Sequence, residues 1–312
     1  MSLLAFVTHP GSRFWAIAIA GFYLACGEPD ALAASVVDDA GVVVAPLRPA
    51  ARIVSLAPHA TELMFGAGAG GRIVGADEYS DYPAIAKTIP RIGRAGALDI
   101  ERIAALKPDL VIAWGSGNVT GQIAALRRLE LTVFISEPHT VADVASTLRR
   151  FGALAGTEKY AEVAAAEFEA KFADLRKRYA SRPTVSVFYQ IWDRPLMTIN
   201  GQHLISAVIE TCGGRNVFAA LPQLAPVVDL EAVLRADPQA IVGSGAESSR
   251  PGWLDDWKRW PRLTAVRDNN LFDVPPDLIQ RHTVRLVDGA ARLCEALETA
   301  RTKTAAGPQT GK

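Results

Sequence analysis

The feature that most constrains this chain is an alternation of short apolar runs with helical patterns, interrupted once in the middle. Runs such as Arg52–Ala57 and Asp109–Trp114 are nearly continuous in Val, Ile, Leu and Ala, and a helical pattern follows each. Strands of this kind are buried on both faces, as in parallel sheets that are covered by helices. The alternation stops between Val141 and Ala180 and resumes at Thr184–Ile191. The sequence therefore predicts an α/β fold with two Rossmann-like lobes.

The interruption itself has a strong helical pattern. Thr157–Ala180 is rich in Ala, Glu and Lys, with apolar residues at helical spacing, and it ends before Pro183. A helix of about two dozen residues is roughly 35 Å long, which is the length of a lobe. We therefore expect one long rigid helix, capped by Thr157, to join the lobes. The expected boundaries are a signal segment at 1–33, a flexible stretch at 34–51, lobes at 52–156 and 182–300, the helix at 157–181 and a polar tail at 301–312.

Within the second lobe, the patterns predict a short strand at Leu196–Ile199 and a helix at His203–Gly214 with a glycine C-cap. A final helix is expected over about Thr283–Thr299.

Charge and the N-terminus narrow the location. The formal net charge is +0 with no basic block, which disfavours nucleic acid or an anionic membrane as the main partner. Arg13 precedes the apolar run Trp15–Ala25, which is too short to span a bilayer and fits a secretory signal. Two processing sites compete: a small-x-small site at Ala31–Ala33, and a lipoprotein-like site in which Cys26 would be lipidated. We expect a periplasmic protein that is either released or lipid-anchored.

Export also bears on the two cysteines that remain after processing, Cys212 and Cys294. In an oxidising compartment, one disulfide between them is the simplest expectation. The alternative is two separate buried thiols.

One phrase occurs in both lobes. Leu98–Trp114 and Val228–Ser244 each contain an Asp, a Glu two positions later, and a Pro before an apolar run. Asp is a good helix N-cap, and an acid in the first turn favours the helix dipole, so the phrase could be helix-start chemistry alone. Its occurrence in both lobes instead suggests equivalent exposed carboxylates, Glu101 and Glu231, at the two lobe tips.

The chain resembles periplasmic binding proteins of ABC importers that have a rigid interlobe helix, and most closely their cobalamin (corrinoid) receptor subgroup. The resemblance covers about Arg52–Thr299 and is carried by "RIVSLAPHATEL", "YSDYP", "IERIAALKPDLVIAW", "CGGRNVF" and the Asp277-x-x-x-Arg281 spacing. It implies a monomeric, non-enzymatic receptor that delivers a corrinoid to an ABC permease, without a resident cofactor. It also implies that Glu101 and Glu231 form salt bridges with permease arginines.

The same resemblance places the ligand between the lobes, where aromatic faces pack on the corrin and charged groups contact its amides. The expected ligand-binding residues are His59, Tyr79, Trp114, Trp192, Asp277 and Arg281. Each has a structural alternative: Trp114 could belong to the core, Asp277 and Arg281 could form only a local ion pair, and Tyr79 could pack its loop.

Two departures from the corrinoid pattern concern the site. Ala95 and Ala225 stand where that subgroup carries pocket tryptophans, and Trp192 is an addition that could replace one of them. No bare-metal site is expected. As secondary alternatives, His59 or His282 could act as an axial ligand to a metal in the bound molecule, and His282 raises heme or a ferric siderophore as the alternative cargo.

A nucleotide-dependent enzyme is the alternative from a different functional class. Gly66–Gly71 formally fits the G-x-G-x-x-G pattern of nucleotide-dependent enzymes. That fingerprint needs a strand before it and a helix after it, whereas here the predicted order is reversed. The glycines therefore indicate a helix end and a turn.

Overall fold

The computed structural model describes residues 34–245 and 250–306, and the side chains of 304–306 are left out. The strands predicted from apolar runs form two parallel sheets of four strands each. The first sheet has the order β4-β3-β7-β8 and the second the order β10-β9-β11-β12. The bounds of the strands are β3 Ile53–Ser55, β4 Ile73–Ala76, β7 Leu110–Trp114, β8 Val133–Ser136, β9 Val185–Gln190, β10 Gly214–Asn216, β11 Ala240–Gly243 and β12 Leu271–Asp273. The predicted fold class of two α/β lobes is confirmed.

Both sheets are covered on both faces. Their helices are α1 Pro58–Gly66, α2 Ile100–Ala105, α3 Thr120–Arg128, α4 Val141–Ala155, α5 Glu158–Tyr179, α6 Leu204–Thr211, α7 Leu230–Ala236, α8 Thr264–Arg267, α9 Pro276–Ile279 and α10 Leu286–Ala306, with short 3₁₀ turns η1 Gly70–Arg72, η2 Ala84–Thr88 and η3 Gly252–Arg259. The central strands pair in parallel, with Ile53 opposite Leu110 and Val187 opposite Ala240. These residues are fully buried, which is why their strands lack a polar face.

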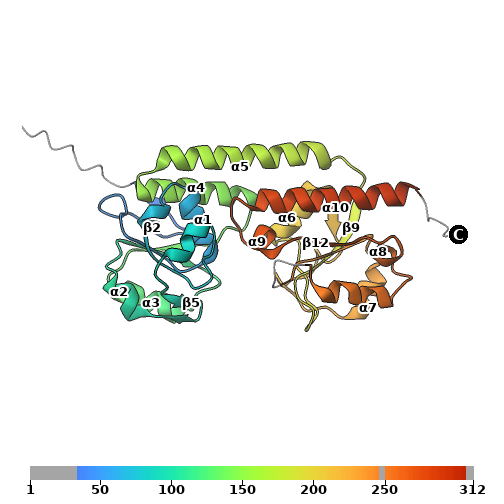
Figure 1. The fold of residues 1–312 in the computed structure, drawn as a ribbon, viewed down its shortest axis with the longest axis horizontal. Helices are drawn as coiled ribbons and strands as arrows, with labels where there is room; N and C mark the ends of the chain where they lie inside the picture. The colour runs from blue at the N-terminus through green and yellow to red at the C-terminus, as the bar shows by residue number, and fades with distance from the viewer. Residues whose placement is uncertain (1–33, 246–249, 307–312) are drawn as a thin grey trace, which may run out of the picture. The chain divides into compact units, whose positions relative to one another are not determined.

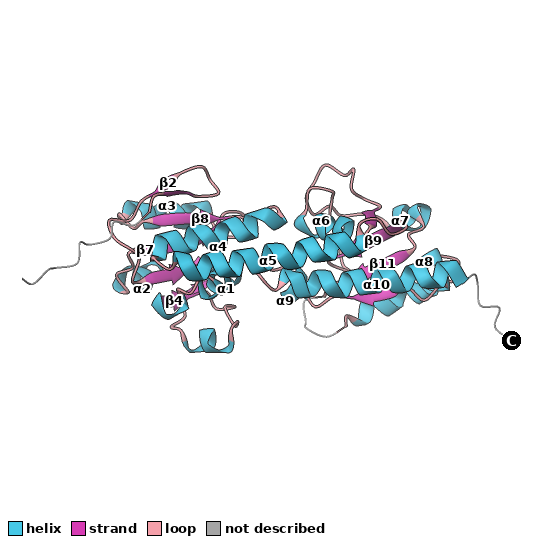
Figure 2. Ribbon diagram, turned by 90° about the horizontal axis from the view of Figure 1, so that it is seen from above, coloured by secondary structure: helices cyan, strands magenta, loops and turns pink. Residues whose placement is uncertain are grey.

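Helix α5 is a single element of 22 residues. Its buried face is formed by Ala161, Ala165, Phe168, Phe172 and Leu175. It contacts α1 and α4 of the first lobe and α6 and α10 of the second, and in Figures 1 and 2 it runs along both lobes. Thr157 precedes α5 as expected but does not cap it with its side chain, because its hydroxyl donates to the Ala67 carbonyl at 2.6 Å.

The turn between α4 and α5 depends on glycine. Gly156 has φ 64° and ends α4, a conformation that glycine adopts without a Cβ clash. A Cβ on Gly152 would lie 2.3 Å from the Ala161 Cβ, so this glycine permits the two helices to approach closely. Helices α4 and α5 thus form a closely packed pair that covers the first lobe.

The apolar interior follows from this layering. One buried cluster contains residues of both sheets together with the buried face of α5, so the core is continuous from one lobe to the other. A second cluster, around Leu56 and Val111, lies on the other face of the first sheet. A third, around Phe188 and Trp257, does the same for the second sheet. The shared cluster ties the lobes through side-chain packing rather than through a flexible linker.

The stretch 34–51, expected to be flexible, contains a hairpin of β1 Val36–Val37 and β2 Val43–Val44. Asp38 is 4% exposed, and its carboxylate accepts from the backbone N–H groups of Val42 and Ile135. Asp39 forms an ion pair with Arg150 at 2.7 Å. A buried carboxylate that accepts backbone hydrogen bonds, as Asp38 does, fixes a chain segment, and these long-range contacts leave no pattern in the local sequence.

Other expectations differ in detail. Leu196–Ile199 forms no named strand; Met197 makes only isolated bridges to Trp192 and Val227. Helix α10 begins at Leu286, not Thr283; the Thr283 hydroxyl donates to the Glu62 carboxylate of the other lobe. It also extends to Ala306, into the expected polar tail. The predicted signal segment 1–33, with Cys26, lies outside the described residues.

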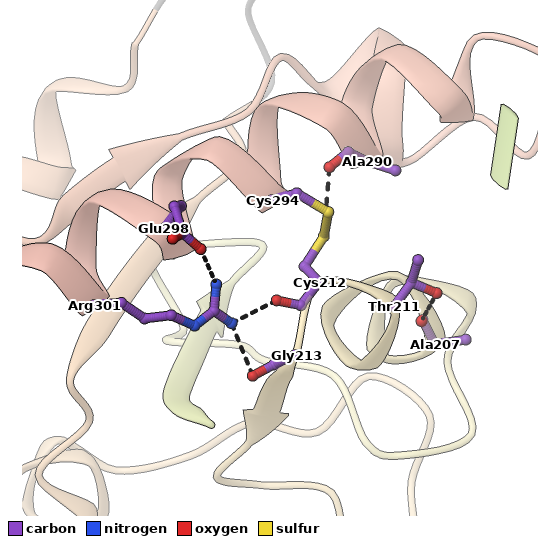
Figure 3. The surroundings of a disulfide bond; sticks show 8 residues. All are labelled: Ala207, Thr211, Cys212, Gly213, Ala290, Cys294, Glu298 and Arg301. Atoms are coloured by element: carbon purple, nitrogen blue, oxygen red, sulfur yellow. Dashed lines mark hydrogen bonds and ion pairs between the residues drawn. A yellow bond between two sulfur atoms is a disulfide. The ribbon is translucent and has the colours of Figure 1, made fainter. Parts of the chain in front are cut away.

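Cys212 and Cys294 form the expected disulfide, which joins the C-terminal end of α6 to α10 (Figure 3). Both residues are fully buried. Beside them, the Arg301 guanidinium donates to the carbonyl oxygens of Cys212 and Gly213 and to the Glu298 carboxylate. The alternative of two separate thiols is therefore wrong.

The glycines of 66–71 end α1 and lead through η1 into β4. The preceding element is a helix and the following element a strand, so the order needed to cradle a nucleotide phosphate is absent at this segment. Among the described residues, no helix combines the length and the apolarity that a membrane span requires.

Candidate ligand-binding cleft

A small cavity lies where residues of the two lobes meet, and a larger cavity adjoins it within the second lobe. The first has a volume of about 110 Å³ and is lined by Pro58, His59, Trp114 and Pro138 of the first lobe and by Gln280, Arg281 and His282 of the second. The second has a volume of about 530 Å³ and is lined by Ile191, Trp192, Pro195, Met197, His203, Ile205 and Gln280. Because Gln280 lines both, we treat them as one site, called the cleft below.

The wall contributed by the first lobe is formed at the carboxyl ends of its strands. His59 lies in the first turn of α1, and Trp114 is the last residue of β7. Their rings meet edge to face with centroids 5.6 Å apart. His59 Nε2 lies 3.3 Å from Ser136 Oγ, and the indole N–H of Trp114 donates to Glu137 at 3.4 Å. Crevices beyond the carboxyl ends of parallel strands are the usual ligand sites of such sheets.

The wall from the second lobe contains Trp192, which is 47% exposed. Its indole N–H donates to the Arg194 carbonyl at 3.1 Å, which fixes the ring on its own loop. It lines the larger cavity together with the apolar side chains of Ile191 and Met197. A large exposed aromatic ring beside an apolar cavity is suited to packing against a flat ligand.

Arg281 bridges the lobes at the cleft. Its guanidinium contacts Asp277 at 3.1 Å within its own lobe and Asp81 of the first lobe at 2.6 Å. Desolvation acts to raise the pKa of Asp81, but the hydrogen bond and charge of Arg281 outweigh it and lower that pKa. The predicted Asp277–Arg281 pair thus exists, and Asp81, within the "YSDYP" motif, is a partner that the sequence analysis did not single out.

Of the six expected ligand-binding residues, four line the cleft: His59, Trp114, Trp192 and Arg281. Asp277 reaches it only through Arg281. Tyr79 is 56% exposed and is not among the residues that line either cavity. Its backbone N–H donates to Asp77 at 2.8 Å, which shapes the loop. Ala95 and Ala225 are both exposed.

Three histidines converge on the cleft. Burial lowers the pKa of His59 to about 3, with a further contribution from His282. Burial likewise lowers the pKa of His203 to about 4 and lowers that of His282. The rings of His203 and His282 meet edge to face with centroids 6.0 Å apart. All three side chains are therefore neutral near pH 7. His203 was expected only at a helix start, where its Nδ1 does accept the Ile205 N–H.

A buried ion pair holds the lobes together beside the cleft. The Glu62 side chain is 2% exposed and binds Arg285 through two hydrogen bonds, at 2.8 and 2.7 Å. It also accepts from the Thr283 hydroxyl at 2.6 Å. The Arg285 guanidinium lies 3.9 Å from the ring centroid of Tyr82. Because Glu62 and Tyr82 belong to the first lobe, this cluster fixes the segment that carries Arg281 and His282.

The two glutamates of the repeated phrase are exposed, Glu101 in the first turn of α2 and Glu231 in the first turn of α7. Asp99 and Asp229 cap these helices by accepting from the third backbone N–H beyond them. Residues Leu32–Lys312 form one compact unit, to which both helices belong. In Figure 1, α2 and α7 lie on the side of the lobes opposite to α5. Among the ion pairs between described residues, none involves Glu101 or Glu231.

Comparison with known proteins agrees with this geometry. Residues 53–278 match the family described as periplasmic binding protein. A vitamin B12-binding protein of Vibrio cholerae serotype O1 is 36% identical over 81% of this chain and 91% of its own length. One from Photorhabdus laumondii is 34% identical over 79% of this chain and 87% of its own length.

Solved structures give the same result. The crystal structure of the periplasmic vitamin B12-binding protein BtuF of Vibrio cholerae superposes with a TM-score of 0.74 at 35% identity, covering 81% of this chain and 98% of that one. A periplasmic heme-binding protein from Roseiflexus sp. RS-1 reaches a TM-score of 0.69 at 23% identity, covering 80% and 98%, which shows a shared fold alone. The chain therefore belongs to the periplasmic binding protein family.

Proposed function

We propose that this protein captures a corrinoid in the cleft between its lobes and delivers it to an ABC importer in the membrane. The observation that carries the proposal is that the cleft combines Trp114 and Trp192, one from each lobe, with the interlobe arginine Arg281. The relatives that share a third of its sequence are named for binding vitamin B12. The larger cavity, about 530 Å³, falls within the roughly 300–1,000 Å³ typical of ligand pockets.

The residues in the cleft suit a corrin. A corrin is a broad plate with amide groups along its edge, so indole faces can pack on the plate. The Arg281 guanidinium can donate to amide carbonyl oxygens, and Asp81 and Asp277 hold it in place. The neutral imidazole of His59 adds a polar group without charge. Heme, whose propionates are anionic, would find one cleft arginine that two carboxylates already neutralise.

We expect the cleft to be largely preformed. The continuous core through α5 and the Glu62–Arg285 pair both oppose separation of the lobes. Recognition by a preformed site loses less conformational entropy than recognition by closure of a hinge.

Calorimetric titration with cyanocobalamin, dicyanocobinamide and hemin tests the ligand. We expect a corrinoid to bind and Trp114→Ala to weaken it by about tenfold or more, because truncating a buried aromatic contact costs more than ~1.4 kcal/mol. Tyr160→Ala, a substitution of a tyrosine on α5 that is 71% exposed, is the matched control and should bind normally. Tight binding of hemin with no binding of either corrinoid would reject the proposal.

We further propose that Glu101 and Glu231 dock the permease through arginines on its surface. Both carboxylates are exposed, occur at matched positions of the two lobes, and lack an ion-pair partner within the described residues. The double variant Glu101→Lys/Glu231→Lys should abolish uptake and leave ligand affinity unchanged. The control Glu167→Lys/Glu295→Lys makes the same charge change on α5 and α10. A collapse of ligand affinity in the first variant would place these glutamates in the pocket instead.

Residues 1–33 are proposed as the export signal, with lipidation of Cys26 as the alternative. Mass spectrometry of the mature protein distinguishes the two: cleavage after Ala33 gives an unmodified N-terminus, whereas the alternative gives an acylated Cys26. An uncleaved N-terminus on cytoplasmic protein would contradict both.

A further inference from the structure

The orientation of His282 is set by one hydrogen bond. Its Nδ1 lies 2.8 Å from the carbonyl oxygen of Pro138, which belongs to the other lobe. A carbonyl oxygen only accepts, so Nδ1 carries the proton. In the neutral imidazole, Nε2 is then left with an unshared electron pair.

The Nε2 atom is open to the cleft. Among the hydrogen bonds between described residues, none uses it, and it is absent from the buried side-chain atoms of those residues that lack a partner. An atom without a partner that is not buried is accessible, and His282 lines the smaller cavity. The titratable and charged residues around His282 include Arg281, which lines the same cavity, together with His59, His203, Glu137 and His139.

The other two cleft histidines present less favourable nitrogens. His203 Nδ1 accepts the Ile205 N–H, so in the neutral ring Nε2 bears the proton. His59 Nε2 is paired with Ser136 Oγ, and its ring is 7% exposed against Trp114. His282 alone among these three combines a fixed ring with an accessible, unprotonated nitrogen.

A histidine that donates one ring N–H to a carbonyl oxygen and leaves the other nitrogen free has the arrangement of a metal ligand. The described residues contain no cluster of three or more His, Cys, Asp or Glu that could hold a bare ion. The metal would therefore have to arrive with ligands of its own, inside a planar macrocycle that needs only axial donors from the protein. A cobalt corrinoid with an exchangeable axial position is such a molecule.

We propose that His282 Nε2 is an axial ligand to the cobalt of the bound corrinoid, and that the protein thereby favours corrinoids whose axial site holds water. This inference rests on the proposed function. In the binding step, a water molecule leaves cobalt(III) and the Nε2 electron pair forms the new Co–N bond. No electron is transferred, and the Nδ1 proton stays on the bond to Pro138.

The test is an absorption titration with diaquocobinamide, accompanied by calorimetry. The wild-type protein should shift the visible bands of the corrinoid as nitrogen replaces water. His282→Gln, whose amide can still donate to the Pro138 carbonyl, should lose the shift and bind at least tenfold more weakly. Dicyanocobinamide, whose axial sites are occupied by cyanide, should bind wild type and His282→Gln equally. Added imidazole should restore the shift in His282→Ala.

The control is His139→Asn, at an exposed histidine that lines neither cavity, which should retain the shift. Binding of diaquocobinamide by the wild type without a shift would overturn the inference and leave the proposed function standing. A shift that survives in His282→Gln and disappears in His59→Asn would also overturn it. If neither cobinamide binds, the proposed function fails together with the inference.

Discussion

The two lobes share one plan, and the places where they depart from it show which features are local and which are tertiary. When the strands of each four-stranded sheet are counted in chain order, both sheets have the order second, first, third, fourth. In both, a non-glycine residue with positive φ lies just after the helix that precedes the third strand of the sheet, Lys107 at 46° and Asp237 at 39°. A proline follows each of them. The repeated phrase is therefore a structural unit as well as a pair of exposed glutamates.

The equivalence extends to the next residue. The Asp109 carboxylate accepts from the backbone N–H of Arg52, and Gln239 Oε1 accepts from the backbone N–H of Ser186, each at 2.9 Å. In both lobes a side chain at the start of the third strand thus anchors the start of the first strand. An acid and an amide perform this task alike, because only a carbonyl-type oxygen is required.

The lobes differ in how they are attached to the helical layer. The second lobe is joined covalently to α10 by the Cys212–Cys294 disulfide. The first lobe is instead held at its outer edge by the hairpin of Asp38 and Asp39, the latter paired with Arg150 of α4. The repeated unit keeps the same helix-capping Asp and the same kind of anchor for the first strand in both lobes, whereas each lobe is attached to the helical layer by different contacts.

Removing the disulfide should have the largest effect. The bridge closes a segment with a sequence separation of 82, for which loop entropy predicts a loss of about 4 kcal/mol in the variant Cys212→Ala/Cys294→Ala. Urea unfolding followed by circular dichroism measures this. Wild-type protein unfolded in reductant is the control and should lose a similar amount. A loss below about 1 kcal/mol would mean that packing of α6 on α10 holds the second lobe unaided.

Acidification should lower the free energy of unfolding through one histidine in each wall of the cleft, His59 and His203. The two contributions should level off at different pH values. Burial lowers the pKa of His59 to about 3 and of His203 to about 4, below their ordinary value of 6.5. The unfolded chain then takes up protons that the folded one excludes, so stability falls as pH drops below 6.5. Each histidine should cost about 2 kcal/mol between pH 6.5 and 5.

Unfolding free energies across pH 3–7 measure this effect. His59→Asn and His203→Asn should each flatten the pH dependence, and only the His59 contribution should continue to grow below pH 4. His139→Asn, at an exposed histidine, is the control. Unchanged slopes in both cleft variants would show that water reaches these rings.

The smallest expected effect distinguishes the two turns with positive φ, at Lys107 and at Asp237. Lys107→Gly should stabilise the protein by up to about 1 kcal/mol, because a left-handed conformation strains a residue with a Cβ. Asp237→Gly should destabilise it by about 1 kcal/mol, since Asp237 also accepts from the backbone and hydroxyl of Thr264, each at 2.8 Å. Thermal melts of both variants give the comparison. Effects of the same sign would mean that the turns are equivalent after all.

The sequence by itself determined what depends on local periodicity and local chemistry. Apolar runs placed the strands, the pattern after Thr157 indicated the long helix, and Asp99 and Asp229 marked two helix starts. The expected ligand-binding residues were implied by the family resemblance, and four of the six line the cleft. His59, Trp114 and Trp192 lie at or just after the carboxyl ends of β3, β7 and β9. The hairpin at 34–51 escaped prediction because its hold on the lobe depends on long-range contacts: the buried Asp38 carboxylate bonds to Ile135, Asp39 pairs with Arg150, and Val44 packs in the core.

The tertiary structure decided every contact between side chains far apart in the chain. Arg281 pairs with Asp81, and Arg285 pairs with Glu62, only once the lobes are packed on α5. The same is true of the hydrogen bond between His282 and the Pro138 carbonyl. No local pattern encodes these pairs, since each member alone resembles an ordinary surface or helix residue. Which way His282 turns, and which of its nitrogens faces the cleft, follows from that packing, because a hydrogen bond across the lobes exists only where both partners have already been placed.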